Sequence, residues 1–75
     1  MIAELESVVL TSDLPEHRLK QGDVGTVVLV HGDKGYEVEF VTLSGETLSV
    51  VSVAPNQVRT VARDEIANAR PVEAA

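Results

Sequence analysis

The sequence predicts an all-β fold, a small and strongly bent antiparallel barrel of five strands. Four of the five glycines fall between Ser12 and Val41, where they bracket two valine-rich segments. The segment Tyr36–Phe40 alternates apolar and acidic residues with period two, as a strand with one solvated face does. Hydrophobic residues make up 44% of the chain but aromatic residues only 3%. The core is therefore expected to be aliphatic, and its β-branched valines favour strands.

Each expected strand is an apolar segment bounded by turn residues. In chain order the strands are Glu4–Thr11, Val24–His31, Tyr36–Val41, Thr47–Val53 and Val58–Val61. Periodicity leaves open whether Val8 or Val9 points inward in the first strand. In the second, the apolar run 27–30 indicates either burial on both faces or a β-bulge.

The fourth strand and the turns carry further expectations. Leu48, Val50 and Val53 compete for the inner face of the fourth strand, which leaves Val51 exposed. We expect a positive φ at one of Gly22 and Gly25 and a close backbone approach at the other. The segment 32–35 predicts a hairpin turn with two glycines at positive φ, and 54–57 predicts a single 3₁₀ turn.

We expect the chain to divide into a barrel over residues 1–61 and a C-terminal tail over residues 62–75. The tail differs from the barrel in composition. Asp64 is a suitable cap for one or two helical turns that reach Ala69 and end at Pro71. A helix that short is marginal unless it docks, so the alternative is a disordered tail.

Length and charge restrict the function classes. A chain of 75 residues buries only one small core. The formal net charge of −6 opposes the counterion release that drives most nucleic-acid binding. With no cysteine and no apolar run long enough for a bilayer, we expect a soluble, cytoplasmic protein without membrane contact.

The excursion from Ser12 to Gln21 is the best candidate for a binding site, because loops on a rigid scaffold commonly carry recognition. The alternative is that the loop only plugs one end of the barrel. Leu14 and Leu19 are expected to pin it to the barrel. The candidate partner-binding residues are Leu14, Pro15, Glu16, His17, Arg18 and Lys20.

Catalytic and metal chemistry are not expected. His17 and His31, the two histidines, lack the short ligand spacing of zinc sites. No serine lies in a Gly-x-Ser-x-Gly elbow, and Gly22 and Gly25 precede no Lys-Ser/Thr phosphate loop. Glu37 and Glu39 suit a solvated strand face better than a catalytic carboxylate pair. We therefore expect no enzyme activity, no cofactor and no metal.

Two segments, DLPEHRLKQGDVGTVV and YEVEF, resemble domain-of-unknown-function family 4926, a family of small bacterial proteins. The similarity runs from about Leu5 to Val61. The matching positions are Asp13, Leu14, Pro15, Leu19, Gly22, Val24, Gly25, Thr26, Val27, Val28 and the five residues 36–40. The resemblance implies an SH3-like barrel, since the GxxGxV core is similar to the KOW motif of ribosomal and transcription-elongation proteins. It implies no activity.

The leading hypothesis is a non-enzymatic module that binds a protein partner, such as the product of a neighbouring gene, through its acidic surface and the loop 12–21. Self-association is a compatible expectation, because the core is small and the fourth strand is rich in valine. The alternative is KOW-like nucleic-acid binding through Arg18, Lys20, Lys34 and Arg59. Acidic loop residues, including Glu16, argue against that alternative.

Overall fold

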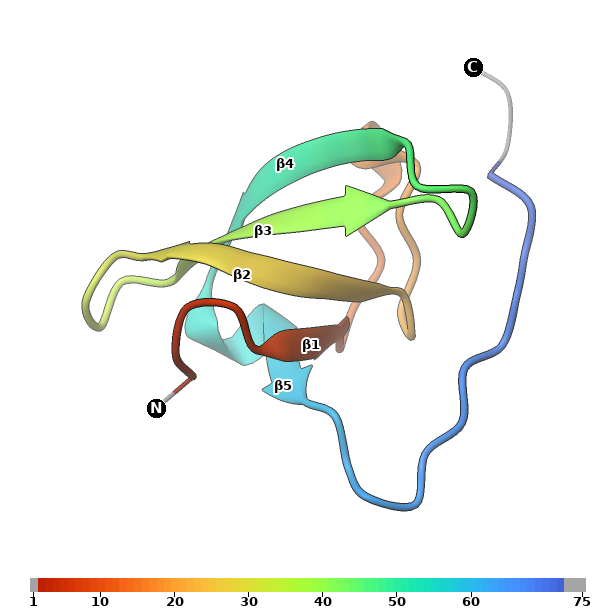
Figure 1. Ribbon diagram of the computed structural model, residues 1–75. Coiled ribbons are helices and arrows are strands. Elements are labelled where there is room, and N and C mark those ends of the chain that lie inside the picture. Colours follow the sequence, from red (N-terminus) through yellow and green to blue (C-terminus); the bar gives the residue numbers. More distant parts are fainter. Residues whose placement is uncertain (1, 73–75) are drawn as a thin grey trace.

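The computed structural model describes residues 2–72 and shows one curled antiparallel sheet (Figure 1). Its strands are β1 (Ser7–Leu10), β2 (Val24–Val30), β3 (Tyr36–Val41), β4 (Thr47–Val53) and β5 (Val58–Thr60). Two short 3₁₀ helices are inserted, η1 (Pro15–His17) between β1 and β2 and η2 (Pro55–Gln57) between β4 and β5. The predicted all-β class, the five strands and the 3₁₀ turn after β4 are confirmed.

The sheet has the strand order β4-β3-β2-β1-β5. β2 connects its two halves, because the start of β2 pairs with β1 and the rest pairs with β3. The two edge strands, β4 and β5, are consecutive in the chain and are joined through η2. The sheet therefore curls on itself in the SH3-like manner, with β5 folded beneath β1 (Figure 1).

The core lies inside this curl and is aliphatic apart from Tyr36 and Phe40. Val8 is completely buried in it. Val9 is also buried, at 6% exposure, but is not part of the core cluster. The sequence left open whether Val8 or Val9 points inward, and the structure places Val8 in the core. Leu10 follows it on the same face, as period two requires.

The irregularities of β2 and of the turn before it occur at the glycines and in the apolar run 27–30. The register between β2 and β3 shifts between Val27 and Leu29, so Val28 is the bulged residue, and the bulge alternative is correct. Gly22 has φ +95°. A Cβ on Gly25 would lie 2.5 Å from Cγ1 of Val38. The two predicted roles, positive φ and close approach, therefore fall to Gly22 and Gly25 respectively.

The inner face of β4 was predicted in the wrong register. Val51 pairs with Val38 and is buried, whereas Val50 pairs with Glu39 and is 53% exposed. A register shift at the end of β3 determines which residues of β4 face inward. A shift of one residue exchanges the two faces of a strand. Val53 is on the inner face, as expected.

The tail does not form the expected helical turns. Residues 61–72 contain one turn at 63–64 and are otherwise irregular. No helix within the described residues 2–72 is long and apolar enough to span a bilayer. Residues 73–75, at the end of the predicted tail, lie outside the described part of the chain.

Candidate functional site

Two buried leucines hold the loop between β1 and β2 against the core. Leu14 is 7% exposed and Leu19 is 2% exposed, and both belong to the core cluster. Their backbones form a reciprocal bridge, with Leu14 N–H donating to the Leu19 carbonyl at 2.9 Å and Leu19 N–H to the Leu14 carbonyl at 3.1 Å. The expected pinning is confirmed, and the loop is closed on itself at its base.

Further hydrogen bonds fix the backbone on either side of this bridge. Asp13 Oδ1 accepts the Gln21 N–H at 2.8 Å, and Asp23 Oδ2 accepts the Lys20 N–H at 2.8 Å. Gly22 N–H donates to the Leu10 carbonyl at 2.9 Å. Each bond satisfies a backbone donor that a turn otherwise leaves to water. The backbone of the loop therefore has a defined conformation.

The predicted contact residues divide by burial. Leu14 lies in the core, so its part is to anchor the loop and it offers no surface to a partner. The other five are exposed, and the structure brings them together around η1: Pro15, Glu16, His17, Arg18 and Lys20. Arg18 ends η1 in the left-handed region, at φ 59° and ψ 31°, and its N–H bonds to the Pro15 carbonyl at 3.1 Å.

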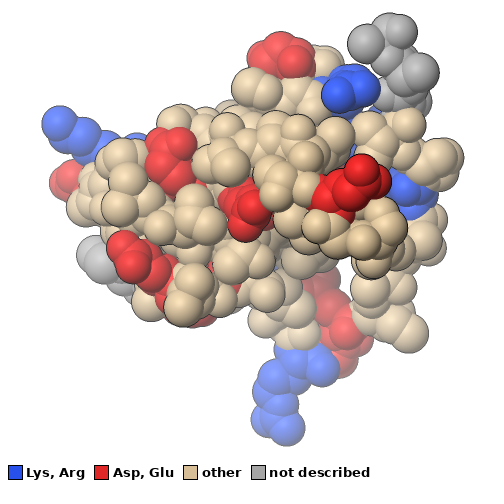
Figure 2. Space-filling model, turned by 45° about the horizontal axis from the view of Figure 1, so that its top comes forward, with Lys and Arg blue, Asp and Glu red and all other residues tan. Residues whose placement is uncertain are grey.

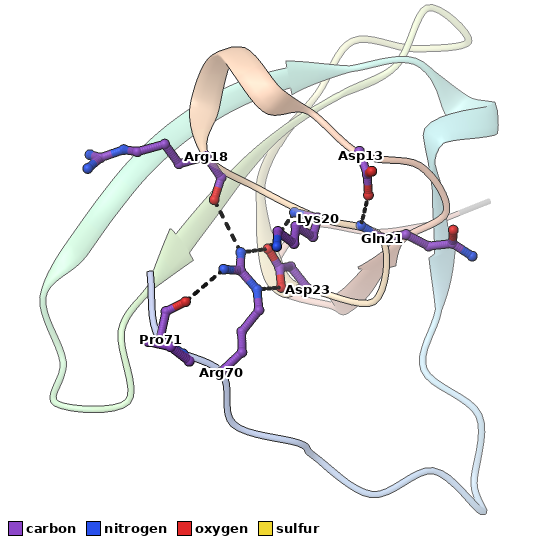
Figure 3. Close-up of polar contacts among 7 residues, drawn as sticks. All are labelled: Asp13, Arg18, Lys20, Gln21, Asp23, Arg70 and Pro71. Atoms are coloured by element: carbon purple, nitrogen blue, oxygen red, sulfur yellow. Dashed lines mark hydrogen bonds and ion pairs between the residues drawn. The ribbon is translucent and has the colours of Figure 1, made fainter. Parts of the chain in front are cut away.

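Arg70 from the tail reaches this loop, which sequence reasoning did not foresee. Its Nε donates to Asp23 Oδ1 at 2.8 Å, and its Nη2 contacts Asp23 Oδ2 and donates to the Arg18 carbonyl at 3.2 Å. Its Nη1 donates to the Pro71 carbonyl at 3.0 Å. Figure 3 shows the guanidinium pointing from the tail into this set of oxygens. The tail therefore contacts the candidate loop through Arg70.

Asp23 is the anion at the centre of this contact. Its side chain is 18% exposed. Burial favours the neutral acid, but the hydrogen bonds from Arg70 and from the Lys20 N–H, together with the nearby positive charges, lower the pKa of Asp23 below its ordinary value. Asp23 is consequently a carboxylate at neutral pH.

A shallow hollow of about 170 Å³ lies beside the ion pair. The lining residues are Asp13, Pro15, Arg18, Leu19, Lys20 and Arg70. Its wall combines the ring of Pro15 and part of Leu19 with charges of both signs. Such a wall suits a mixed polar and apolar side chain.

The outer face of β2, β3 and β4 mixes carboxylates with apolar side chains. Glu37 lies between Leu29 and Ser52 in one cross-strand row, and Glu39 pairs with Val50 in another. Hydrogen bonds from the Ser52 hydroxyl and from His31 lower the pKa of Glu37. Figure 2 shows Asp and Glu spread over the face in view, while Lys and Arg lie at its margins.

The four bases of the nucleic-acid hypothesis are not gathered in one patch. Arg18 and Lys20 lie at the start of β2, whereas Lys34 is in the β2–β3 hairpin at the far end of that strand, about 20 Å away for a strand of this length. Arg59 forms a two-bond ion pair with Glu65, at 2.8 and 2.6 Å. That ion pair and the Ala62 N–H lower the pKa of Glu65 to about 2.

The two histidines also lie apart. His17 ends η1, and His31 Nε2 lies 2.8 Å from Glu37 Oε2. Within residues 2–72, no group of three or more His, Cys, Asp or Glu side chains is placed to hold a metal ion.

The residues that the sequence did not reveal are Asp23 and Arg70. Asp23 stands between Gly22 and Val24 and resembles an ordinary turn aspartate. Arg70 lies 47 positions further along the chain. Because the two residues are so far apart in the sequence, no local sequence pattern predicts their ion pair.

Comparison with known proteins identifies a family and adds no activity. No curated protein and no solved structure matches the chain. One family model matches residues 4–60, that of a domain of unknown function, DUF4926. The match covers β1 to β5 and ends before the tail. The chain belongs to the DUF4926 family.

Proposed function

We propose that this chain is a non-enzymatic protein-interaction module, and that the loop 12–21 is its binding surface. One observation carries the proposal: the loop backbone is bonded internally and pinned by Leu14 and Leu19, while the side chains around η1 are exposed. The connection between β1 and β2 runs from Thr11 to Asp23, and it needs no such internal bonding to join two strands.

Rigidity favours binding, because a surface that is already ordered loses little conformational entropy when a partner docks. Loops held on a stable sheet are the usual place for recognition residues. Glu16, His17 and Lys20 supply charge and hydrogen bonding, and Pro15 with the adjacent hollow supplies apolar contact. These are the ingredients of a small protein interface.

The charge of the molecule indicates the character of the partner. A net charge of −6 with carboxylates along the outer face of β3 favours a basic or neutral protein surface, and it accelerates the encounter with a basic one. A polyproline ligand is disfavoured, because such grooves need exposed aromatic rings. Tyr36 and Phe40 are 7% and 2% exposed.

Site-specific photo-crosslinking in the native host tests the proposal. A photoreactive amino acid is placed at Glu16 or His17 in the loop and, as a matched control, at Asp33 in the exposed hairpin at the opposite end of β2. We expect a discrete, protease-sensitive adduct from the loop positions and none from Asp33.

Two results would contradict the proposal. Equal adducts from the loop and from Asp33 would show that the loop is not the binding surface. An adduct that nuclease removes would favour the KOW-like alternative instead.

A further inference from the structure

The tail contact defines a receptor for one chemical group, the guanidinium of arginine. Asp23 offers both carboxylate oxygens, and the Arg18 carbonyl adds a third acceptor at 3.2 Å from Arg70 Nη2. Two-oxygen contact with a carboxylate matches the planar fork of arginine, which lysine cannot reproduce. We call Asp23 and the Arg18 carbonyl the arginine notch (Figure 3).

The loop itself holds the acceptors in place. The Lys20 N–H fixes Asp23 Oδ2 at 2.8 Å, and Asp23 N–H returns a bond to the Lys20 carbonyl at 3.0 Å. The left-handed backbone of Arg18 sets the direction of its carbonyl. None of these bonds involves the tail, so the bonds that position the two acceptors do not depend on Arg70.

The group that fills the notch belongs to a segment outside the hydrophobic core. Residues 61–69 are all exposed, and Ile66 is 93% exposed. The family match ends at residue 60, so Asp23 and Arg18 lie inside the family domain and Arg70 lies outside it. The receptor is thus part of the domain, whereas its occupant is carried on an appended strap.

We propose that the arginine notch is a binding site for an arginine side chain of the partner, and that Arg70 occupies it in competition, so that the tail acts as a displaceable strap over the loop. This inference rests on the proposed function, because it names the chemistry of the partner at the same loop. The hollow beside the notch gives the residues that flank such an arginine a place to lie.

A test with a defined peptide separates this inference from the identity of the partner. The probe is the hexapeptide Ala-Asn-Ala-Arg-Pro-Val with blocked ends, which copies residues 67–72. It is added to the full chain carrying Arg70→Ala, and the amide signals of Lys20 and Asp23 are followed by NMR. The control peptide has citrulline, which is uncharged, in place of arginine.

We expect the arginine peptide to shift both amide signals in a saturable manner, and the citrulline peptide to have no effect. In the wild-type chain the tail competes at an effective concentration on the order of millimolar. The apparent affinity there is therefore reduced several-fold, in proportion to the fraction of open notch. Asp23→Asn in the Arg70→Ala chain keeps the acceptor for the Lys20 N–H and abolishes peptide binding.

Three results would overturn the inference: equal binding of the two peptides, equal affinity for wild type and Arg70→Ala, or unchanged binding in Asp23→Asn. Unaltered signals from core strands in every variant show that folding is intact. Failure of the photo-crosslinking experiment would contradict the proposed partner-binding loop but would not change the peptide results. The two proposals can therefore fail separately. If both hold, Arg70→Ala also raises the yield of loop crosslinks.

Discussion

Replacing Gly25 by alanine tests how tightly β2 and β3 pack. The added Cβ would lie 2.5 Å from Val38 Cγ1, 2.9 Å from the Glu39 carbonyl oxygen and 2.9 Å from Phe40 Cε1. One of these atoms belongs to the backbone of β3, and the other two belong to side chains of the core. Relief therefore requires a shift of the strand or of the core.

The size of the effect follows from these contacts. Overfilling a packed core costs about 1–3 kcal/mol, and a clash that includes backbone belongs at the upper end. A domain of this length has a free energy of unfolding of about 4–11 kcal/mol. Because about 1 kcal/mol corresponds to 4–8 °C in a domain of this size, Gly25→Ala is expected to lower Tm by roughly 10–20 °C.

Thermal unfolding followed by circular dichroism measures this change. The matched control is Gly32→Ala, where φ is +60° and no atom lies within 4 Å of the added Cβ, so only the left-handed backbone costs about 1 kcal/mol. If Gly25→Ala melts at the same temperature as Gly32→Ala or the wild type, the close packing of β2 on β3 is wrong.

Three further changes have defined outcomes. Ser49→Ala removes a buried hydroxyl that has no hydrogen-bond partner and is expected to raise the free energy of unfolding by up to about 1 kcal/mol; a clear loss of stability in calorimetry would contradict this. Leu19→Ala empties a site that is 2% exposed and is expected to cost about 2–5 kcal/mol in denaturant unfolding; a loss under 1 kcal/mol would show that the loop is not anchored. The pKa of Glu65 is about 2, against an ordinary 4.5, so its ion pair with Arg59 stabilises the folded tail above pH 4.5 and is lost as the pH falls through about 2. NMR titration of the Glu65 carboxyl tests this, and a midpoint near 4.5 would refute it.

The sequence predicted those parts of the fold that depend on local chemistry. Gly22 and Gly25 indicated a turn and a close approach because no other residue meets both needs. The strict alternation of apolar and acidic residues over Tyr36–Phe40 predicted which side chains of that strand face inward. The inner face of β4 could not be predicted in this way, because valines occupy both of its faces. The register shift beside Val41 determines which of them point inward.

The candidate site was predictable only in part. The loop 12–21 was recognisable from its length, its proline and its two leucines. The contact of Arg70 with the arginine notch was not, because Arg70 follows Asp23 by 47 positions and lies in an irregular tail. Asp64 suggested a helix cap, but the following residues are exposed through 69. A short helix without a packed face gains too little to form.

Both proposals depend on the loop 12–21 being a pre-formed part of the barrel, and amide hydrogen exchange measures that property residue by residue. The Leu14 and Leu19 amides are bonded to each other's carbonyls, so we predict that they exchange about as slowly as amides of β2. Exposed tail residues 67–69 supply the fast reference in the same sample. Exchange of Leu14 and Leu19 at the rate of that reference would contradict a rigid binding loop.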